Sequence, residues 1–171
     1  SETVRKLPDP YSVSNIEMAR RLSYFIWARM PDDELLEAGN QGTLSKLESL
    51  TGQVDRMISD QKAKRFFERF TLQWLRIEGL GNTIAPDEYL FPSFTASLMD
   101  AMKNESVLVF GDILRDNRSL LNLLKSDSTF MSAELAEHYG YHEVKIHHWR
   151  KVPLRDSTRC GLLTHASVLT V

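Results

Sequence analysis

The sequence predicts an all-α fold: a single-domain helical bundle of six to seven helices, followed by a short irregular or β-hairpin-like C-terminal segment. Its 171 residues are 42% hydrophobic and 26% charged, a composition typical of a globular domain with one core. Capping residues recur ahead of apolar stripes with a helical period, whereas strand-like alternation is confined to the residues after Gly140. We therefore expect an extended lead-in at 1–13, the bundle at 14–140 and the C-terminal segment at 141–171.

Each predicted helix has a signal at its beginning and an apolar stripe along its length. Ser14 and Ser45 have capping-box spacing to Glu17 and Glu48, in which the hydroxyl takes an orphan amide and the carboxylate reaches back. Pro31 begins the second helix, with three acidic residues set against the positive end of the helix dipole. The predicted helices lie at 14–29, 31–39, 45–59, 60–77, 95–115, 119–124 and 133–139.

The clearest apolar stripe lies in the fourth predicted helix, which Asp60 caps. Six residues recur there at spacings of three and four, the period of one helix face. We expect this face to form the centre of the core, because an aromatic stripe at helical spacing is typical of buried packing. The stripe comprises Ala63, Phe66, Phe67, Phe70, Trp74 and Ile77.

The longest predicted helix, at 95–115, is expected to lie at the centre of the bundle. Its apolar residues wrap more than one face, so neighbours are expected on several sides. Before it, closely spaced glycines and prolines predict a loop with one helical turn at 87–90. After it, Ser132 caps the last helix, Gly140 ends that helix in the left-handed conformation, and weak alternation at 149–154 favours a strand.

Charge, apolar run lengths and cysteine content exclude several classes of function. Lys plus Arg number 21 and Asp plus Glu number 23, with the signs interleaved, so no basic field is present to bind nucleic acid. The apolar runs are much shorter than the ~20 residues that span a bilayer, so we expect no membrane span in this segment. Cys160 is the single cysteine, which excludes two-thiol sites, and we expect no cofactor in this segment.

Three stretches of the chain carry a recognisable pattern. They are RLSYFIW at 21–27 with MPDDELL at 30–36, DSTF at 127–130 with LAEHYG at 135–140, and GLLTHASVLT at 161–170. Together they resemble the domains of unknown function in large exported proteins of planctomycete type, which usually also carry a c-type cytochrome domain. The resemblance covers residues 11–170, nearly the whole chain.

The resemblance implies a location and partners, but no activity. It implies a periplasmic or extracellular protein whose partners are the neighbouring domains of the same parent protein, a c-type cytochrome domain among them. Residues 161–170 resemble the beginning of the family's next domain. Two positions depart from the family pattern: Ser132 replaces the usual Asn, which is an equally good helix cap, and Cys160 replaces a Gly at a position suited to close backbone approach.

Four residues are candidates for chemistry. Glu105 and Asp112 lie on the inward side of the predicted central helix, and paired carboxylates can divide acid and base roles in glycoside hydrolysis. Ion pairs with an arginine such as Arg21 or Arg76 explain two inward acids equally well.

His138 is expected in the last helical turn, where its ring contacts the C-terminal carbonyls. As an alternative it carries a proton, with Asp127 as its carboxylate partner.

The histidines near the end of the helical region are weak candidates for a metal site. His142, His147 and His148 follow His138, and imidazole is an ordinary ligand of zinc and copper. His138 and His142 have the i, i+4 spacing of one helix face, but Gly140 between them is expected to end the helix, which would break that geometry. These three histidines also lie outside the family resemblance, so a surface loop is the alternative interpretation.

No phosphate-binding loop, nucleophile elbow or zinc-protease motif occurs in the chain. Our leading hypothesis is therefore a non-catalytic helical scaffold or interaction module within a larger exported, multidomain protein. The alternative is an enzyme or carbohydrate-binding domain. Its cleft would be formed by Glu105, Asp112, Asp127 and His138.

Overall fold

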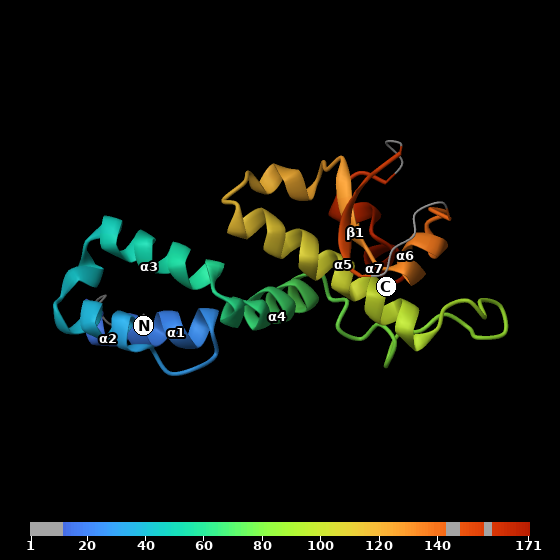
Figure 1. Ribbon diagram of the computed structural model, residues 1–171. Coiled ribbons are helices and arrows are strands. Elements are labelled where there is room, and N and C mark those ends of the chain that lie inside the picture. Colours follow the sequence, from blue (N-terminus) through green and yellow to red (C-terminus); the bar gives the residue numbers. More distant parts are fainter. Residues whose placement is uncertain (1–11, 143–147, 156–158) are drawn as a thin grey trace, which may run out of the picture. The chain divides into compact units, whose positions relative to one another are not determined.

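The predicted fold class is confirmed by the computed structural model, which describes residues 12–142, 148–155 and 159–171 (Figure 1). These described residues form seven α-helices, four short 3-10 helices and one antiparallel pair of strands. The α-helices are α1 (Asn15–Ile26), α2 (Asp33–Asn40), α3 (Leu47–Ser59), α4 (Lys64–Trp74), α5 (Ala96–Arg115), α6 (Ala133–His138) and α7 (Ala166–Leu169). The 3-10 helices are η1 (Thr43–Ser45), η2 (Gln61–Ala63), η3 (Leu120–Leu123) and η4 (Leu162–Thr164), and the strands are β1 (Ser128–Met131) and β2 (Arg150–Pro153).

The chain divides into two compact units, which we call the N-terminal unit (residues 1–57) and the C-terminal unit (residues 58–171). Among the described helices, none combines the length and the apolar character needed to cross a membrane.

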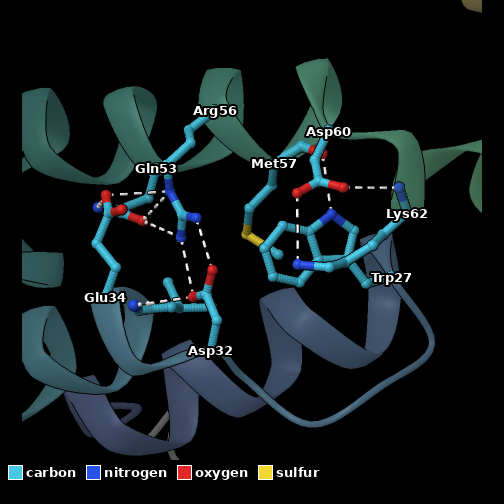
Figure 2. Close-up of polar contacts among 9 residues, drawn as sticks. Trp27, Asp32, Glu34, Gln53, Arg56, Met57, Asp60 and Lys62 are labelled. Carbon is cyan, nitrogen blue, oxygen red and sulfur yellow. Dashed lines mark hydrogen bonds and ion pairs between the residues drawn. The ribbon is translucent and has the colours of Figure 1, made fainter.

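In the N-terminal unit, α1 and α2 pack against each other around buried Ala19 and Leu35. They approach closely at Gly39, where a Cβ would lie 3.2 Å from the side chain of Ile16. The end of α3 is tied to the loop between α1 and α2 by Arg56, whose guanidinium bonds both oxygens of Asp32 at 2.7 and 3.0 Å (Figure 2). Such a two-point contact fixes orientation as well as distance.

The same unit shows how local signals set the helix ends. The Ser14 hydroxyl accepts a hydrogen bond from the Glu17 amide at 3.2 Å, as the capping spacing predicts. α1 ends three residues earlier than predicted, and Ala28 beyond it adopts a positive φ of 52°. The predicted cap at Ser45 is wrong: its hydroxyl donates to the Gly42 carbonyl at 3.0 Å within η1, so α3 begins later.

In the C-terminal unit, α5 is central, as its apolar character on several faces predicts. It contacts α4, α6, α7, β1 and η3. Met102 and Ile113 on α5 are among the largest fully buried side chains. Gly111 lets the Phe67 ring of α4 lie against the helix, because a Cβ there would come within 3.1 Å of the ring.

The prediction that the whole α4 stripe is buried is wrong for two of its aromatic residues. Phe67 is buried, but Phe70 is 38% and Trp74 is 52% exposed. Phe70 stacks on Phe110 of α5 at 5.1 Å between ring centroids, and Trp74 lies 6.2 Å from the same ring. These two rings therefore cover Phe110 at the surface, and α4 ends before Ile77, which is buried from the following turn.

The C-terminal strand is present, and its partner lies between two predicted helices of the bundle region, where no strand was predicted. β2 pairs antiparallel with β1 in a register that joins Thr129 to Val152 and Met131 to Arg150. Thr129 and Met131 point into the unit and are buried, which is the alternation expected of a strand with one covered face. The predicted β-hairpin-like element is thus completed by residues that precede α6.

Gly161, and not position 160, is the point of close backbone approach near the C-terminus. It has a positive φ of 84°, and a Cβ there would collide with the backbone of Leu123 and Leu124. The family-like glycine at 161 is therefore required by geometry. Cys160 is half-buried beside it, so the thiol does not occupy the tight position.

Candidate functional site

A buried polar cluster in the C-terminal unit is centred on Glu105 of α5, which is 1% exposed. Its two carboxyl oxygens each accept one short hydrogen bond, from the Thr129 hydroxyl at 2.7 Å and from the Tyr139 hydroxyl at 2.6 Å. The Tyr139 oxygen in turn accepts the Ala166 amide at 2.9 Å, so its only proton goes to Glu105. One carboxyl group therefore joins α5 to β1, to the end of α6 and to the start of α7.

The cluster continues through the residue that follows Glu105 on the helix. The Ser106 hydroxyl lies 2.9 Å from Nδ1 of His165 and 2.9 Å from the Ser167 hydroxyl. Nε2 of His165 lies 3.8 Å from Oε1 of Glu105, too long for a hydrogen bond. Ser106, His165 and Ser167 are fully or almost fully buried. We call the six residues the Glu105 network: Glu105, Ser106, Thr129, Tyr139, His165 and Ser167.

A small cavity adjoins this network, lined by Glu105, Thr129, Tyr139, Arg159 and His165 among others. Its volume is about 10 Å³, which is room for about one water molecule. A substrate would not fit unless the surrounding elements moved apart.

Arg159 brings positive charge to the cavity. Its guanidinium lies 4.1 Å from the centre of the Tyr139 ring, and its Nη1 donates to the Thr164 carbonyl at 3.4 Å. A cation above an aromatic face is attracted by the electron-rich ring. Arg159 therefore places a positive charge at the cavity. The contacts that the structure shows for its guanidinium are with Tyr139 and Thr164.

Burial sets the protonation states of the network. It raises the pKa of Glu105 from 4.5 to about 7, against the hydrogen bonds from Tyr139 and Thr129 and the charge of Arg159, which lower it. Burial, and then Arg159, lowers the pKa of His165 from 6.5 to about 4. Burial and the neighbouring Glu105 raise the pKa of Tyr139 well above its usual value. In mildly acidic solution, both Glu105 and His165 are consequently neutral.

Ser106, His165 and Glu105 follow one another in the order of a nucleophile, a general base and an acid that orients the base, which is the arrangement of a catalytic triad. Three observations argue against it: Ser106 is fully buried, its hydroxyl is shared with Ser167, and the imidazole lies beyond hydrogen-bond distance of the carboxyl. A nucleophile must reach its substrate, and this one is enclosed. The network is better explained as a set of satisfied polar contacts that hold four elements together.

Two of the four predicted site residues lie on α5 in different surroundings. Glu105 points inward as predicted, and the hydrogen-bond partners that the structure shows for its carboxyl oxygens are two hydroxyls. Asp112 makes ion pairs with Arg118 and, at 2.7 Å, with Lys151. The structural interpretation of Asp112 is therefore supported with partners other than those predicted.

Asp127 and His138 have contacts of their own. The Asp127 carboxylate accepts the Ser128 hydroxyl at 3.2 Å, and its carbonyl accepts the Leu154 amide at 2.7 Å beside the sheet. His138 ends α6 with its ring edge-on to Phe94 at 5.3 Å, and burial lowers its pKa. Of the four predicted residues, Glu105 is the one that lines the small cavity.

Two of the three histidines predicted as weak metal-site candidates can be placed in the structure. His142 and His148 are described, whereas His147 lies outside the described residues. In the part of the chain that the structure describes, no three side chains of His, Cys, Asp or Glu are grouped to share a metal ion.

Sequence reasoning missed most of the Glu105 network. Thr129, Tyr139, His165 and Ser167 all lie in stretches that carry the family resemblance, which was the available signal. Ser106 follows Glu105 within a helix that is otherwise apolar on this side, so two adjacent polar residues at a buried position could have indicated a polar cluster.

One comparison with known proteins identifies a family. A family model described as "Protein of unknown function (DUF1592)", named PSD4, matches residues 13–141. The match includes Glu105, Ser106, Thr129 and Tyr139, while His165 lies beyond it. No curated protein and no solved structure matches the chain.

Proposed function

The chain belongs to the PSD4 family, described as a protein of unknown function (DUF1592), and on that premise we propose that it is a non-catalytic helical scaffold. It holds neighbouring domains of a larger exported protein, a c-type cytochrome domain among them. The observation that carries the proposal is a pair of exposed apolar segments at the two ends of α5.

The first segment, the 89–91 loop, lies just before α5. Tyr89 is 98% exposed, Leu90 is 73% exposed and Phe91 is half exposed. The loop is ordered by Asp87, whose carboxylate accepts the Tyr89 amide at 2.8 Å and whose carbonyl accepts the Phe91 amide at 2.8 Å. Large apolar side chains held out on an ordered loop are typical of an interaction site.

The second segment, the 120–124 turn, follows α5. Leu120, Leu121 and Leu124 are exposed there, while Leu123 is buried and anchors the turn. The Ser119 hydroxyl accepts the Leu121 amide at 3.3 Å and fixes its beginning. Three exposed leucines on one short turn present an apolar surface that a partner could cover.

α5 separates these two segments by a fixed length. It has 20 residues, and at about 1.5 Å per residue it is roughly 30 Å long. Figure 1 shows the 89–91 loop and the 120–124 turn near its opposite ends. A helix surrounded by packed elements and tied by the Glu105 network is a rigid spacer, which is what holding two domains apart requires.

The non-catalytic part of the proposal rests on the Glu105 network. Within the network, the carboxyl oxygens of Glu105 accept hydrogen bonds from the hydroxyls of Thr129 and Tyr139. The adjoining cavity has a volume of about 10 Å³. Buried polar groups that satisfy one another rigidify a core. The alternative of an enzyme or carbohydrate-binding domain requires a cleft that Asp112, Asp127 and His138 share with Glu105, and their separate contacts give it no support.

The test is biolayer interferometry between this chain and each domain that flanks it in its parent protein, the cytochrome domain included. We expect at least two flanking domains to bind, with Leu90→Ser weakening one complex and Leu121→Ser weakening the other, each by tenfold or more. Leu47→Ser is the matched control, because Leu47 is equally exposed but lies in the N-terminal unit. Absence of binding to every flanking domain, or equal binding by all three variants, would overturn the proposal.

A further inference from the structure

A second cavity of the C-terminal unit lies along the packed pair α4 and α5, away from the Glu105 network. Its volume is about 250 Å³, near the lower end of the range for small-molecule sites. Its apolar wall includes Phe67, Val107, Leu108 and Trp149. Its polar groups are Lys64, Asn104 and Arg115. We call this cavity the α4–α5 groove.

The groove follows from the spacing of residues on α5. Asn104, Leu108, Gly111 and Arg115 recur at intervals of three and four, so they share one helix face. Gly111 has no side chain at the centre of this face, so the buried Phe67 ring packs there and backs the groove. Trp149, which comes before β2, is partly exposed at the edge.

The charge of the groove has one sign. Lys64 and Arg115 line it, and no acidic side chain does. Within the described residues, neither cation has an acidic partner within ion-pair distance. Arg115 instead lies with its guanidinium 4.8 Å from the centre of the Phe67 ring. Two cations that have no acidic partner among the described residues create a positive potential at this apolar surface.

We propose that the α4–α5 groove binds a small organic anion that has a flat apolar body and one carboxylate. The body would lie against Leu108 and Trp149, in front of the buried Phe67 ring, and the carboxylate would pair with Lys64 and Arg115. An uncharged sugar is a poorer fit, because Asn104 is the one uncharged polar side chain among the lining residues and sugar hydroxyls need many hydrogen-bond partners.

A neighbouring cavity indicates which end of the α4–α5 groove would hold the carboxylate. It has a volume of about 280 Å³, shares Asn104 and Val107 with the groove, and is lined by Glu68, Asp100 and Lys103. The Lys103 ammonium is already bound, to Asp100 at 2.7 Å and to the Leu80 carbonyl at 2.9 Å. Glu68 therefore makes this end unfavourable for an anion, so the carboxylate is directed to the end formed by Lys64 and Arg115.

The test uses 2-naphthoate as the probe and 2-naphthamide as its uncharged counterpart, with binding to the whole chain measured by isothermal titration calorimetry. We expect naphthoate to bind at least tenfold more tightly than naphthamide, and the difference to shrink as salt is raised. The double variant Lys64→Met, Arg115→Met is expected to remove this preference. Lys125→Met is the matched control, because Lys125 is exposed in the same unit and lies outside the groove.

A second variant tests the apolar body separately. Leu108→Trp fills the groove without changing charge and is expected to weaken both probes by tenfold or more. Circular dichroism checks that each variant is folded. Equal affinity for the two probes, undiminished naphthoate binding by the double variant, or no binding at millimolar concentration would overturn the proposal. None of these outcomes depends on the scaffold function.

Discussion

Replacing Glu105 by glutamine is expected to change how the free energy of unfolding depends on pH. In the folded protein the pKa is about 7 for Glu105 and about 4 for His165, against ordinary values of 4.5 and 6.5. Between pH 4.5 and 6.5 the folded pair thus holds one proton, on Glu105, and the unfolded pair also holds one, on His165. Stability changes with pH only when the two states bind different numbers of protons, so this pair contributes no slope there.

In Glu105→Gln this balance is lost. The folded state no longer holds a proton on the pair, while the unfolded state still protonates His165 below pH 6.5. The unfolded state then binds one more proton, so the free energy of unfolding rises with pH by about 1.4 kcal/mol per pH unit. Over roughly two pH units, the variant should gain about 3 kcal/mol relative to the wild type.

The opposite substitution gives the opposite slope. In His165→Gln only Glu105 remains, and the folded state holds the extra proton between pH 4.5 and about 7. The stability of this variant should therefore fall, by about 3 kcal/mol, as pH rises through that window. The double variant should again show no slope from this site.

Glutamine suits the Glu105 position because the network can accommodate an amide. Tyr139 must donate to the amide oxygen, since its own oxygen accepts the Ala166 amide. The amide nitrogen then faces Thr129, whose hydroxyl can accept as well as donate. The substitution thus removes the titration while keeping two hydrogen bonds.

The assay is urea unfolding followed by circular dichroism at half-unit steps from pH 4.5 to 7.5, on the wild type, both single variants and the double variant. Differences between variants at each pH isolate the pair, because all other titrating groups are common to the four proteins. If the Glu105→Gln profile runs parallel to the wild type between pH 4.5 and 6.5, the assignment of neutral Glu105 and neutral His165 is refuted.

Two further substitutions and one labelling experiment test separate features of the structure. Tyr139→Phe leaves two buried polar atoms without their partner, Oε2 of Glu105 and the Ala166 amide, so we expect the free energy of unfolding to fall by about 2 kcal/mol or more. A loss below about 0.5 kcal/mol would mean that the bonds add little. Asp32→Ala removes both the cap of α2 and the partner of an arginine, and should cost about 1–2 kcal/mol in urea unfolding; a similar loss in the control Asp33→Ala would contradict this account. Ser106 is fully buried, so a fluorophosphonate reagent should leave it unlabelled in native protein by mass spectrometry, and labelling there would contradict the non-catalytic proposal.

The helices could be predicted because their signals are local. Ser14, Thr95 and Ser132 each accept the amide three residues ahead, so the cap and its partner are close in sequence. Where prediction failed, a second local option competed. Ser45 bonds back to Gly42, and the chain turns at Ala28 through a positive φ, neither of which the apolar period reveals.

The candidate site could be predicted in part. The position of Glu105 on an inward helix face follows from helical period, and its burial agrees. Its partners could not be found this way, because Tyr139 and Thr129 are 34 and 24 residues away, and Ser106 meets His165 across 59. Nothing in a local pattern selects among the many hydroxyls at such distances.

The sequence by itself therefore determined where α1, α5 and α6 begin, which residues are apolar on each helix, and that α5 would be surrounded, because capping and amphipathic period act over three to four residues. Only the tertiary structure decided that Phe70 and Trp74 stay at the surface, that β1 and β2 pair, and that Gly111 opens a groove beside Phe67. Those outcomes depend on which elements meet, and packing between distant segments is the physical cause that a local pattern does not contain.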